Sequence, residues 1–180
     1  MKPRIVFIHG NGATTWKFAW TPWLKSELEK LGFETNFQLF PDSIIARVEF
    51  WIPFLHEHIK AGENDVLVGW SSGANAAMRY AERYRIKGSV LVAPSLTNLG
   101  IDLEKQSGYY DTPWDFVSMK NNQEQVALFY SDNDEFIPKH EFETIAKELS
   151  PQVFHFEKQG HFMNQTTFPE LLAYLVQTYT

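Results

Sequence analysis

The chain has 180 residues, of which 16 are Lys or Arg and 22 are Asp or Glu, so its formal net charge is −6 at pH 7. This length fits one hydrophobic core, and we expect residues 1–180 to form a single domain. Basic residues form no cluster along the chain, which argues against a nucleic-acid partner. The absence of cysteine excludes disulfides, thiol nucleophiles and thiolate metal sites.

Apolar segments in this chain are short. None approaches the roughly 20 residues that span a bilayer, and the first apolar run, residues 5–8, is too short for a signal peptide. We therefore expect a cytoplasmic protein without membrane contact. The aromatic content of 16%, with six tryptophans, predicts that aromatic rings line a core or a pocket.

Apolar runs alternate with helical patterns along the chain. Runs that predict strands lie at 5–8, 33–40, 66–68, 89–92, 126–130 and 153–156. Apolar residues at helical spacing predict helices over 20–31, 47–60, 72–84, 138–149 and 168–179. This alternation predicts an α/β fold, a six-stranded, mostly parallel sheet with helices on both faces.

Residues 94–125 have a weaker pattern, in which only 113–120 looks helical. A segment of this length without clear elements can lie over the edge of a sheet as a small cover. The sequence leaves open whether it covers a site. Ligands of parallel sheets bind beyond the carboxyl ends of the strands, near a change in strand order.

The sequence Gly69-Trp70-Ser71-Ser72-Gly73 follows the third predicted strand and precedes the third predicted helix. In this context G-x-S-x-G is the nucleophile elbow, a sharp turn that presents its serine at the carboxyl edge of the sheet. Ser71 is therefore the candidate nucleophile. Side chains at Gly69 and Gly73 would collide with the neighbouring helix or strand, so the turn requires glycine there.

A serine hydroxyl needs a base within hydrogen-bond reach and a carboxylate that orients the base. His161 directly follows the last predicted strand on a glycine-containing loop and is the candidate base. The carboxylate should follow the preceding strand, where Asp132 and Asp134 both lie. We prefer Asp134 because an apolar pair ending in proline follows it just before a helix, and Asp132, with a turn as its other role, remains the competitor.

Attack on a carbonyl forms an oxyanion, which two backbone N–H groups would stabilise. We expect these donors to be Ser72, directly after the nucleophile, and Asn11, in the glycine-bearing loop after the first strand. Trp70 and Phe162 each neighbour a proposed catalytic residue and are the candidate substrate-binding residues, of which at least one should reach the pocket wall. The histidine spacing predicts no metal site, and the sequence implies no cofactor.

Several groups of residues resemble a known family, among them Gly10-Asn11-Gly12, Pro41-Asp42, Ser71-Ser72-Gly73 and Gly160-His161-Phe162. The chain resembles an α/β-hydrolase, and more closely the family of small serine hydrolases that includes the retinoblastoma-binding serine hydrolase and bacterial relatives. The resemblance covers nearly the whole length. It implies a compact α/β-hydrolase fold without a large cap domain.

The resemblance implies hydrolysis of a small-molecule ester or amide, with aminopeptidase-like activity as one form, through an acyl-enzyme and a Ser-His-Asp triad. It does not imply a retinoblastoma-type partner, because that contact depends on an L-x-C-x-E segment and this chain has no cysteine. A non-catalytic protein-binding module is the alternative, and a lyase or cofactor-free oxygenase is a third possibility within the fold. Substrate identity and oligomeric state stay open.

Overall fold

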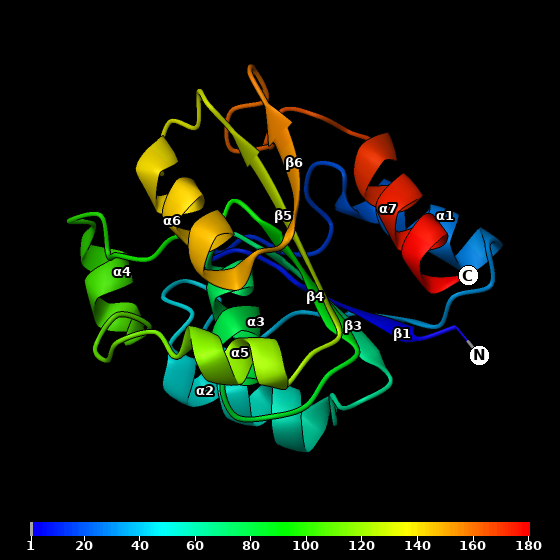
Figure 1. The fold of residues 1–180 in the computed structure, drawn as a ribbon, viewed down its shortest axis with the longest axis horizontal. Helices are drawn as coiled ribbons and strands as arrows, with labels where there is room; N and C mark the ends of the chain where they lie inside the picture. The colour runs from blue at the N-terminus through cyan, green and yellow to red at the C-terminus, as the bar shows by residue number, and fades with distance from the viewer. Residues whose placement is uncertain (1) are drawn as a thin grey trace.

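A strongly twisted parallel sheet crosses the centre of the molecule in the computed structural model, which describes residues 2–180 (Figure 1). Its six strands lie in the order β2-β1-β3-β4-β5-β6, and every neighbouring pair is parallel. The strands are β1 (Arg4–Ile8), β2 (Thr35–Phe37), β3 (Asp65–Trp70), β4 (Gly88–Val92), β5 (Gln125–Ser131) and β6 (Gln152–Phe156). The expected six-stranded α/β fold is confirmed.

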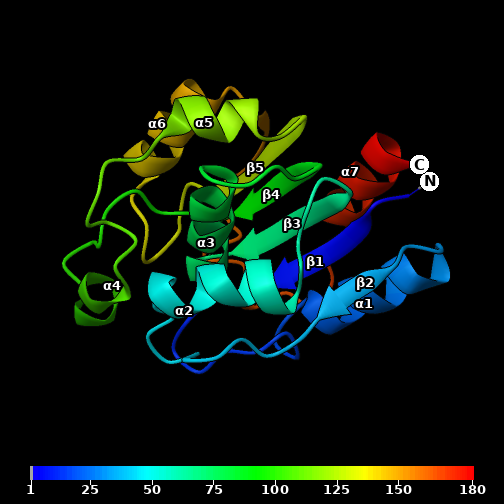
Figure 2. The same cartoon turned by 90° about the horizontal axis from the view of Figure 1, so that it is seen from below.

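Helices cover both faces of this sheet, as Figures 1 and 2 show. The first and last helices, α1 (Thr21–Lys30) and α7 (Pro169–Tyr179), pack together on one face. The other face carries α2 (Val48–Pro53), α3 (Ser72–Ala81), α5 (Phe116–Asn121) and α6 (Lys139–Leu149). No helix within residues 2–180 is both long and apolar enough to cross a membrane.

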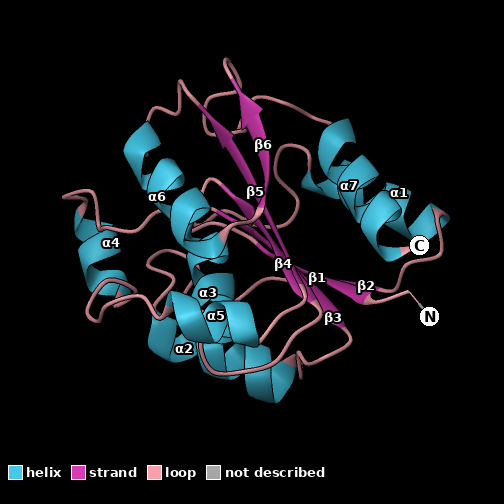
Figure 3. Ribbon diagram, in the orientation of Figure 1, coloured by secondary structure: helices cyan, strands magenta, loops and turns pink. Residues whose placement is uncertain are grey.

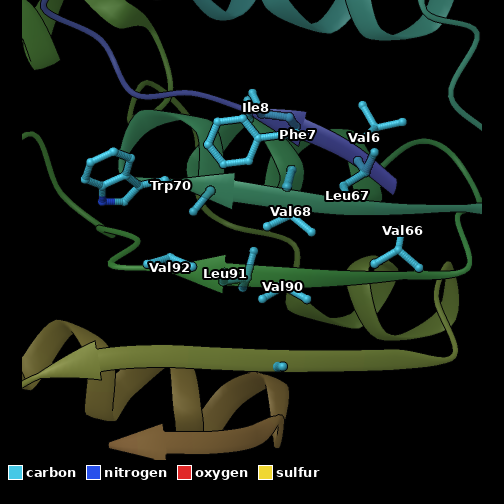
Figure 4. Packing of buried hydrophobic residues seen from close by; sticks show 14 of the residues in the cluster. Val6, Phe7, Ile8, Val66, Leu67, Val68, Trp70, Val90, Leu91 and Val92 are labelled. Carbon is cyan, nitrogen blue, oxygen red and sulfur yellow. The ribbon is translucent and has the colours of Figure 1, made fainter. Parts of the chain in front are cut away.

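The central strands are apolar on both sides because helices cover both sides. Every residue of β3 and of β4 is buried. Figure 4 shows Val6, Val68 and Val90, from three neighbouring strands, within this core. Val68 pairs in register with Val90, so apolar side chains of adjacent strands pack side by side. This buried centre supports the loops that follow β1 and β3.

Two expected elements differ from the structure. The strand expected at 33–40 is only Thr35–Phe37, because the N–H of Phe33 caps the end of α1 at Leu28 and the N–H of Phe40 donates to the ring of His9. The helix expected at 47–60 consists of α2 followed by a π-helical turn, η1 (Phe54–His58), which begins directly after a proline that has no N–H to donate. The other predicted bounds agree to within three residues.

The strand order changes at β1, which has β2 on one side and β3 on the other. At such a switch point the loops after the two strands diverge and leave a crevice at the carboxyl edge of the sheet. Beyond this edge lies α4 (Asp102–Ser107), a helix that the sequence analysis did not predict (Figure 2). It interrupts the long loop that leads from β4 to α5, drawn in pink in Figure 3.

Candidate active site

Ser71 lies in a strained turn between β3 and α3. Its backbone angles are φ 57° and ψ −123°, outside the regions that a residue with a side chain ordinarily adopts. A Cβ at Gly69 would lie 2.3 Å from the Gly73 oxygen, and a Cβ at Gly73 would lie 2.1 Å from the Ile8 oxygen. Both glycines are therefore required for the close approach of β1, β3 and α3, as expected from the elbow motif.

His161 forms a buried pair with Asp134. The ring Nδ1 of His161 lies 2.8 Å from Asp134 Oδ2, and the two side chains are 7% and 0% exposed. The other oxygen of Asp134 accepts the backbone N–H groups of Phe136 at 2.9 Å and Ile137 at 3.0 Å. Because the carboxylate accepts at Nδ1–H, the imidazole presents Nε2 as its free acceptor.

Asp132 lies elsewhere and has other partners. Its Oδ1 is 2.8 Å from Lys139 Nζ and 2.9 Å from His155 Nε2. The hydrogen bond from Lys139 holds the pKa of Asp132 below its usual value. Asp134 is therefore the partner of His161, whereas Asp132 pairs with His155 of β6 and with Lys139 at the start of α6.

The backbone of His161 is held from two sides. The indole Nε1 of Trp70 donates to the His161 carbonyl oxygen at 3.0 Å, and Glu135 Oε2 accepts the His161 N–H at 3.0 Å. The ring of Phe136 meets the imidazole edge-on, with a centroid distance of 5.1 Å. Trp70, at the carboxyl end of β3 (Figure 4), lines the pocket as expected.

Phe162 does not reach the pocket, and its expected role as a substrate-binding residue is wrong. Its side chain is 0% exposed, stacks on Phe168 at 5.1 Å and meets Phe156 edge-on at 5.6 Å. The backbone at Phe162 has φ 59°, which turns the ring into the core while the neighbouring His161 faces the pocket. Of the two aromatic candidates, only Trp70 is a wall residue.

Ser71 and His161 line the same pocket, which has a volume of about 210 Å³. Its walls are largely apolar and include Phe18, Phe136, Leu99 and Ile101. The last two belong to the segment 94–125, so this segment covers the site. The pocket opens at the switch point between β1 and β3, where a parallel sheet is expected to bind ligands.

Asn11 and Ser72 also line this pocket. Within residues 2–180 no backbone carbonyl accepts a hydrogen bond from the N–H of either residue. Both donors are therefore free to bind an oxygen atom of a ligand. Glu104 of α4 is a further lining residue, and the sequence analysis missed it. No group of three or more His, Asp or Glu side chains in the described part of the chain is arranged to hold a metal ion.

A family model described as "Serine hydrolase" matches residues 5–176. The chain belongs to the serine hydrolase family. This serine hydrolase is 35% identical over 171 residues to "Serine hydrolase RBBP9" of Rattus norvegicus, an alignment that covers 94% of the chain and 91% of the relative. It is 27% identical over 180 residues to "Putative hydrolase YdeN" of Bacillus subtilis, which covers 95% of the chain and 92% of the relative.

Solved structures agree with this assignment at the level of the fold. The crystal structure of the ydeN gene product from B. subtilis has a TM-score of 0.87 at 23% identity and covers 97% of both chains. The Pyrococcus furiosus esterase PF2001 has a TM-score of 0.69 at 14% identity and covers 99% of this chain and 83% of its own. This serine hydrolase therefore has the compact α/β-hydrolase fold.

Proposed function

We propose that this serine hydrolase cleaves small esters or amides through an acyl-enzyme on Ser71. The observation that carries the proposal is that Ser71 and the Asp134-paired His161 line one pocket. A serine on a strained elbow is exposed to substrate, and a histidine held by a buried carboxylate is the base that such a serine needs. These three residues follow the chain order Ser, Asp, His that the fold uses.

In the acylation step, Ser71 Oγ attacks the substrate carbonyl carbon while His161 Nε2 takes the hydroxyl proton. The Asp134 carboxylate stabilises the imidazolium that forms and does not itself take up a proton. The carbonyl oxygen becomes an oxyanion, and the N–H groups of Asn11 and Ser72 donate to it. The imidazolium then gives its proton to the leaving alcohol or amine as the carbonyl re-forms, which leaves the acyl group on Ser71.

Deacylation repeats the same steps with water as the nucleophile. The water oxygen attacks the acyl carbon while His161 takes a proton from the water. The oxyanion that forms binds again to the N–H groups of Asn11 and Ser72. The proton returns from His161 to Ser71 Oγ as the acid leaves. The same three side chains therefore serve both halves of the reaction.

The pocket supports a small and largely apolar substrate. Its volume of about 210 Å³ has room for a short acyl chain or one ring, and Phe18, Trp70 and Phe136 supply aromatic walls. One structural neighbour, PF2001 of Pyrococcus furiosus, is named an esterase. Ester hydrolysis is therefore the first reaction to test, with an aminoacyl amide as the comparison.

The decisive experiment is labelling with a fluorophosphonate probe, together with turnover of p-nitrophenyl acetate, by the wild type and Ser71→Ala. We expect the variant to lose labelling and to hydrolyse the ester at background rate while it keeps its thermal unfolding temperature. Unchanged labelling in Ser71→Ala would contradict the proposal. A protein-binding module on this fold would turn over no ester or amide above the Ser71→Ala background.

A further inference from the structure

Glu104 of α4 is a buried carboxylate that faces both proposed oxyanion donors. The residue is 9% exposed and lines the pocket. Its Oε1 accepts a hydrogen bond from Asn11 Nδ2 at 2.5 Å and a longer one from Ser72 Oγ at 3.4 Å. A single carboxylate oxygen therefore connects the loop after β1 with the first residue of α3.

The other oxygen of Glu104 also accepts a hydrogen bond. Tyr110 donates its hydroxyl to Glu104 Oε2 at 2.9 Å. Burial, followed by the charge of Glu104, raises the pKa of Tyr110, so this phenol stays protonated. The same hydroxyl oxygen lies 2.7 Å from Asn75 Nδ2 and 2.7 Å from Ser95 Oγ. Because Asn75 belongs to α3, this network fixes the carboxylate relative to the helix that carries the elbow.

The hydrogen-bond partners of the Glu104 carboxylate in the described part of the chain are an amide and two hydroxyl groups. Among the ion pairs of residues 2–180, none involves this carboxylate. The cost of burying a carboxylate is offset by the hydrogen bonds that it accepts, and those of Glu104 come from Asn11, Ser72 and Tyr110. Two of these three donors, Asn11 and Ser72, carry the proposed oxyanion N–H groups.

The backbone of the loop that carries Asn11 is fixed by a different part of the chain from α4. Gly12 and Ala13 donate their N–H groups to the carbonyls of Ile44 and Ser43, at 3.0 and 3.1 Å. The Asn11 side chain, in contrast, donates toward the pocket side, to Glu104. The carboxylate thus holds the one residue of this loop whose N–H is expected to meet the substrate.

We propose that Glu104 is a positioning residue, whose carboxylate holds Asn11 and Ser72 so that their backbone N–H groups point at the oxyanion. The proposal rests on the proposed function of Ser71 as nucleophile. In this role Glu104 accepts hydrogen bonds and does not bind a charged group of the substrate. A glutamine can accept the bonds from Asn11 and Ser72 through its amide oxygen while its NH2 group replaces the oxygen that accepts from Tyr110, whereas an alanine accepts none of them.

The test compares kcat and KM for p-nitrophenyl acetate in the wild type, Glu104→Ala and Glu104→Gln, per site that reacts with the fluorophosphonate probe. A misplaced oxyanion donor weakens the transition state more than the bound substrate. We expect Glu104→Ala to lower kcat about 10- to 100-fold with KM little changed. Glu104→Gln should restore kcat to within about threefold of the wild type, since the acceptor is retained.

Glu141→Ala is the matched control. Glu141 is also a buried carboxylate, 3% exposed, and it accepts the N–H of Leu96 at 2.6 Å, so it anchors the same cover segment. Its hydrogen bonds come from Leu96 and Thr97, and not from Asn11 or Ser72. We expect this variant to unfold at a lower temperature but to keep the kcat of the wild type per reactive site.

Asn11→Ala provides a second, independent test that leaves Glu104 in place. This variant keeps the backbone N–H and removes the side chain that Glu104 holds. It should show most of the loss of kcat seen in Glu104→Ala, because the bond from Asn11 is shorter than the bond from Ser72. The double variant should lose little more than Glu104→Ala, because both changes remove the bond between Asn11 and Glu104. If Glu104→Ala does not fold, Asn11→Ala and Glu104→Gln still decide the proposal.

Three outcomes overturn it. The first is wild-type kcat in Glu104→Ala or in Asn11→Ala. The second is a loss of kcat in Glu104→Gln as large as that in Glu104→Ala. If this loss is greater for alanine p-nitrophenyl ester, which carries an ammonium group, than for the neutral acetate, the carboxylate binds the charge of the substrate. The third is a wild type that the probe does not label at Ser71, which overturns the proposed function as well. A labelled wild type with a fully active Glu104→Ala overturns only the role of Glu104.

Discussion

Trp70 donates its indole N–H to the carbonyl oxygen of His161 at 3.0 Å, so the residue next to the candidate nucleophile holds the backbone of the candidate base. This hydrogen bond connects the elbow after β3 with the loop after β6. The two loops are far apart along the chain, and their relative position determines whether Oγ of Ser71 and the imidazole can meet. We therefore expect Trp70 to affect catalysis as well as the shape of the pocket.

Trp70→Phe keeps an aromatic ring and removes the indole donor. We expect kcat to fall about three- to tenfold, the equivalent of one hydrogen bond. The comparison is Trp114→Phe, which removes an indole bond of the same length, 3.0 Å, to the Leu96 oxygen. Ester turnover under saturating substrate measures both variants. Equal losses in the two would show that the Trp70 bond has no particular role in catalysis.

Asp134→Asn tests the carboxylate of the proposed triad. Asparagine can present its amide N–H to His161 Nδ1, which favours the wrong tautomer and removes the charge that stabilises the imidazolium. We expect kcat to fall about 10⁴-fold with the fold retained. Asp132→Asn removes the competing carboxylate, which pairs with Lys139 and His155, and should stay within about twofold of the wild type because exposed ion pairs contribute little. A larger loss in Asp132→Asn than in Asp134→Asn would exchange the two assignments.

The elbow and the histidine loop could be predicted from the sequence because each depends on a local pattern. An apolar strand, the two glycines around Ser71 and the small residues of α3 are neighbours along the chain. The choice between Asp132 and Asp134 was harder, because both follow β5. The register between β5 and β6 pairs Tyr130 with His155, and the ladder continues from the Asp132 N–H to the Phe156 oxygen. This pairing directs Asp132 to His155, and no sequence pattern contains it.

Phe162 and Glu104 show what sequence patterns could not supply. Adjacency to His161 suggested a pocket position for Phe162, but neighbouring side chains in a turn point in different directions. Glu104 belongs to a six-residue helix, which is too short to show a helical period. Its partners, Asn11 and Ser72, lie 93 and 32 residues away along the chain. Such contacts exist only once the sheet and its cover have assembled.

The elbow glycines allow a sharp test of packing. A Cβ at Gly73 would lie 2.1 Å from the oxygen of Ile8, a backbone atom at the end of β1 that cannot move without shifting the sheet. We expect Gly73→Ala to lower the free energy of unfolding by about 3 kcal/mol. Gly62→Ala is the control, since no atom lies within 4 Å of its added Cβ and its φ is not positive. Urea unfolding of both variants measures the difference, and equal stability of the two would contradict the steric account.

His9 makes the stability of this protein depend on pH. The side chain is 0% exposed, its Nε2 accepts the Phe40 N–H at 3.0 Å, and its Nδ1 contacts the Gly10 oxygen at 2.7 Å. Burial lowers the pKa of His9 below its usual 6.5, and the hydrogen bond to Gly10 opposes this shift only in part. Below pH 6.5 the unfolded chain therefore binds a proton at this position that the folded chain does not bind.

It follows that the His9 contribution to stability is complete above pH 6.5 and declines as the pH falls toward the lowered pKa of the folded state. The decline amounts to about 1.4 kcal/mol per pH unit at most. We expect His9→Gln to be less stable than the wild type at pH 7.5, because the bond to Phe40 is disturbed, and to lose less stability on going to pH 5.5. Urea unfolding at the two pH values measures this difference, with the exposed His140→Gln as the control for histidine titration in general. A wild type and a His9→Gln variant with the same loss between these pH values would show that burial does not hold the His9 ring neutral.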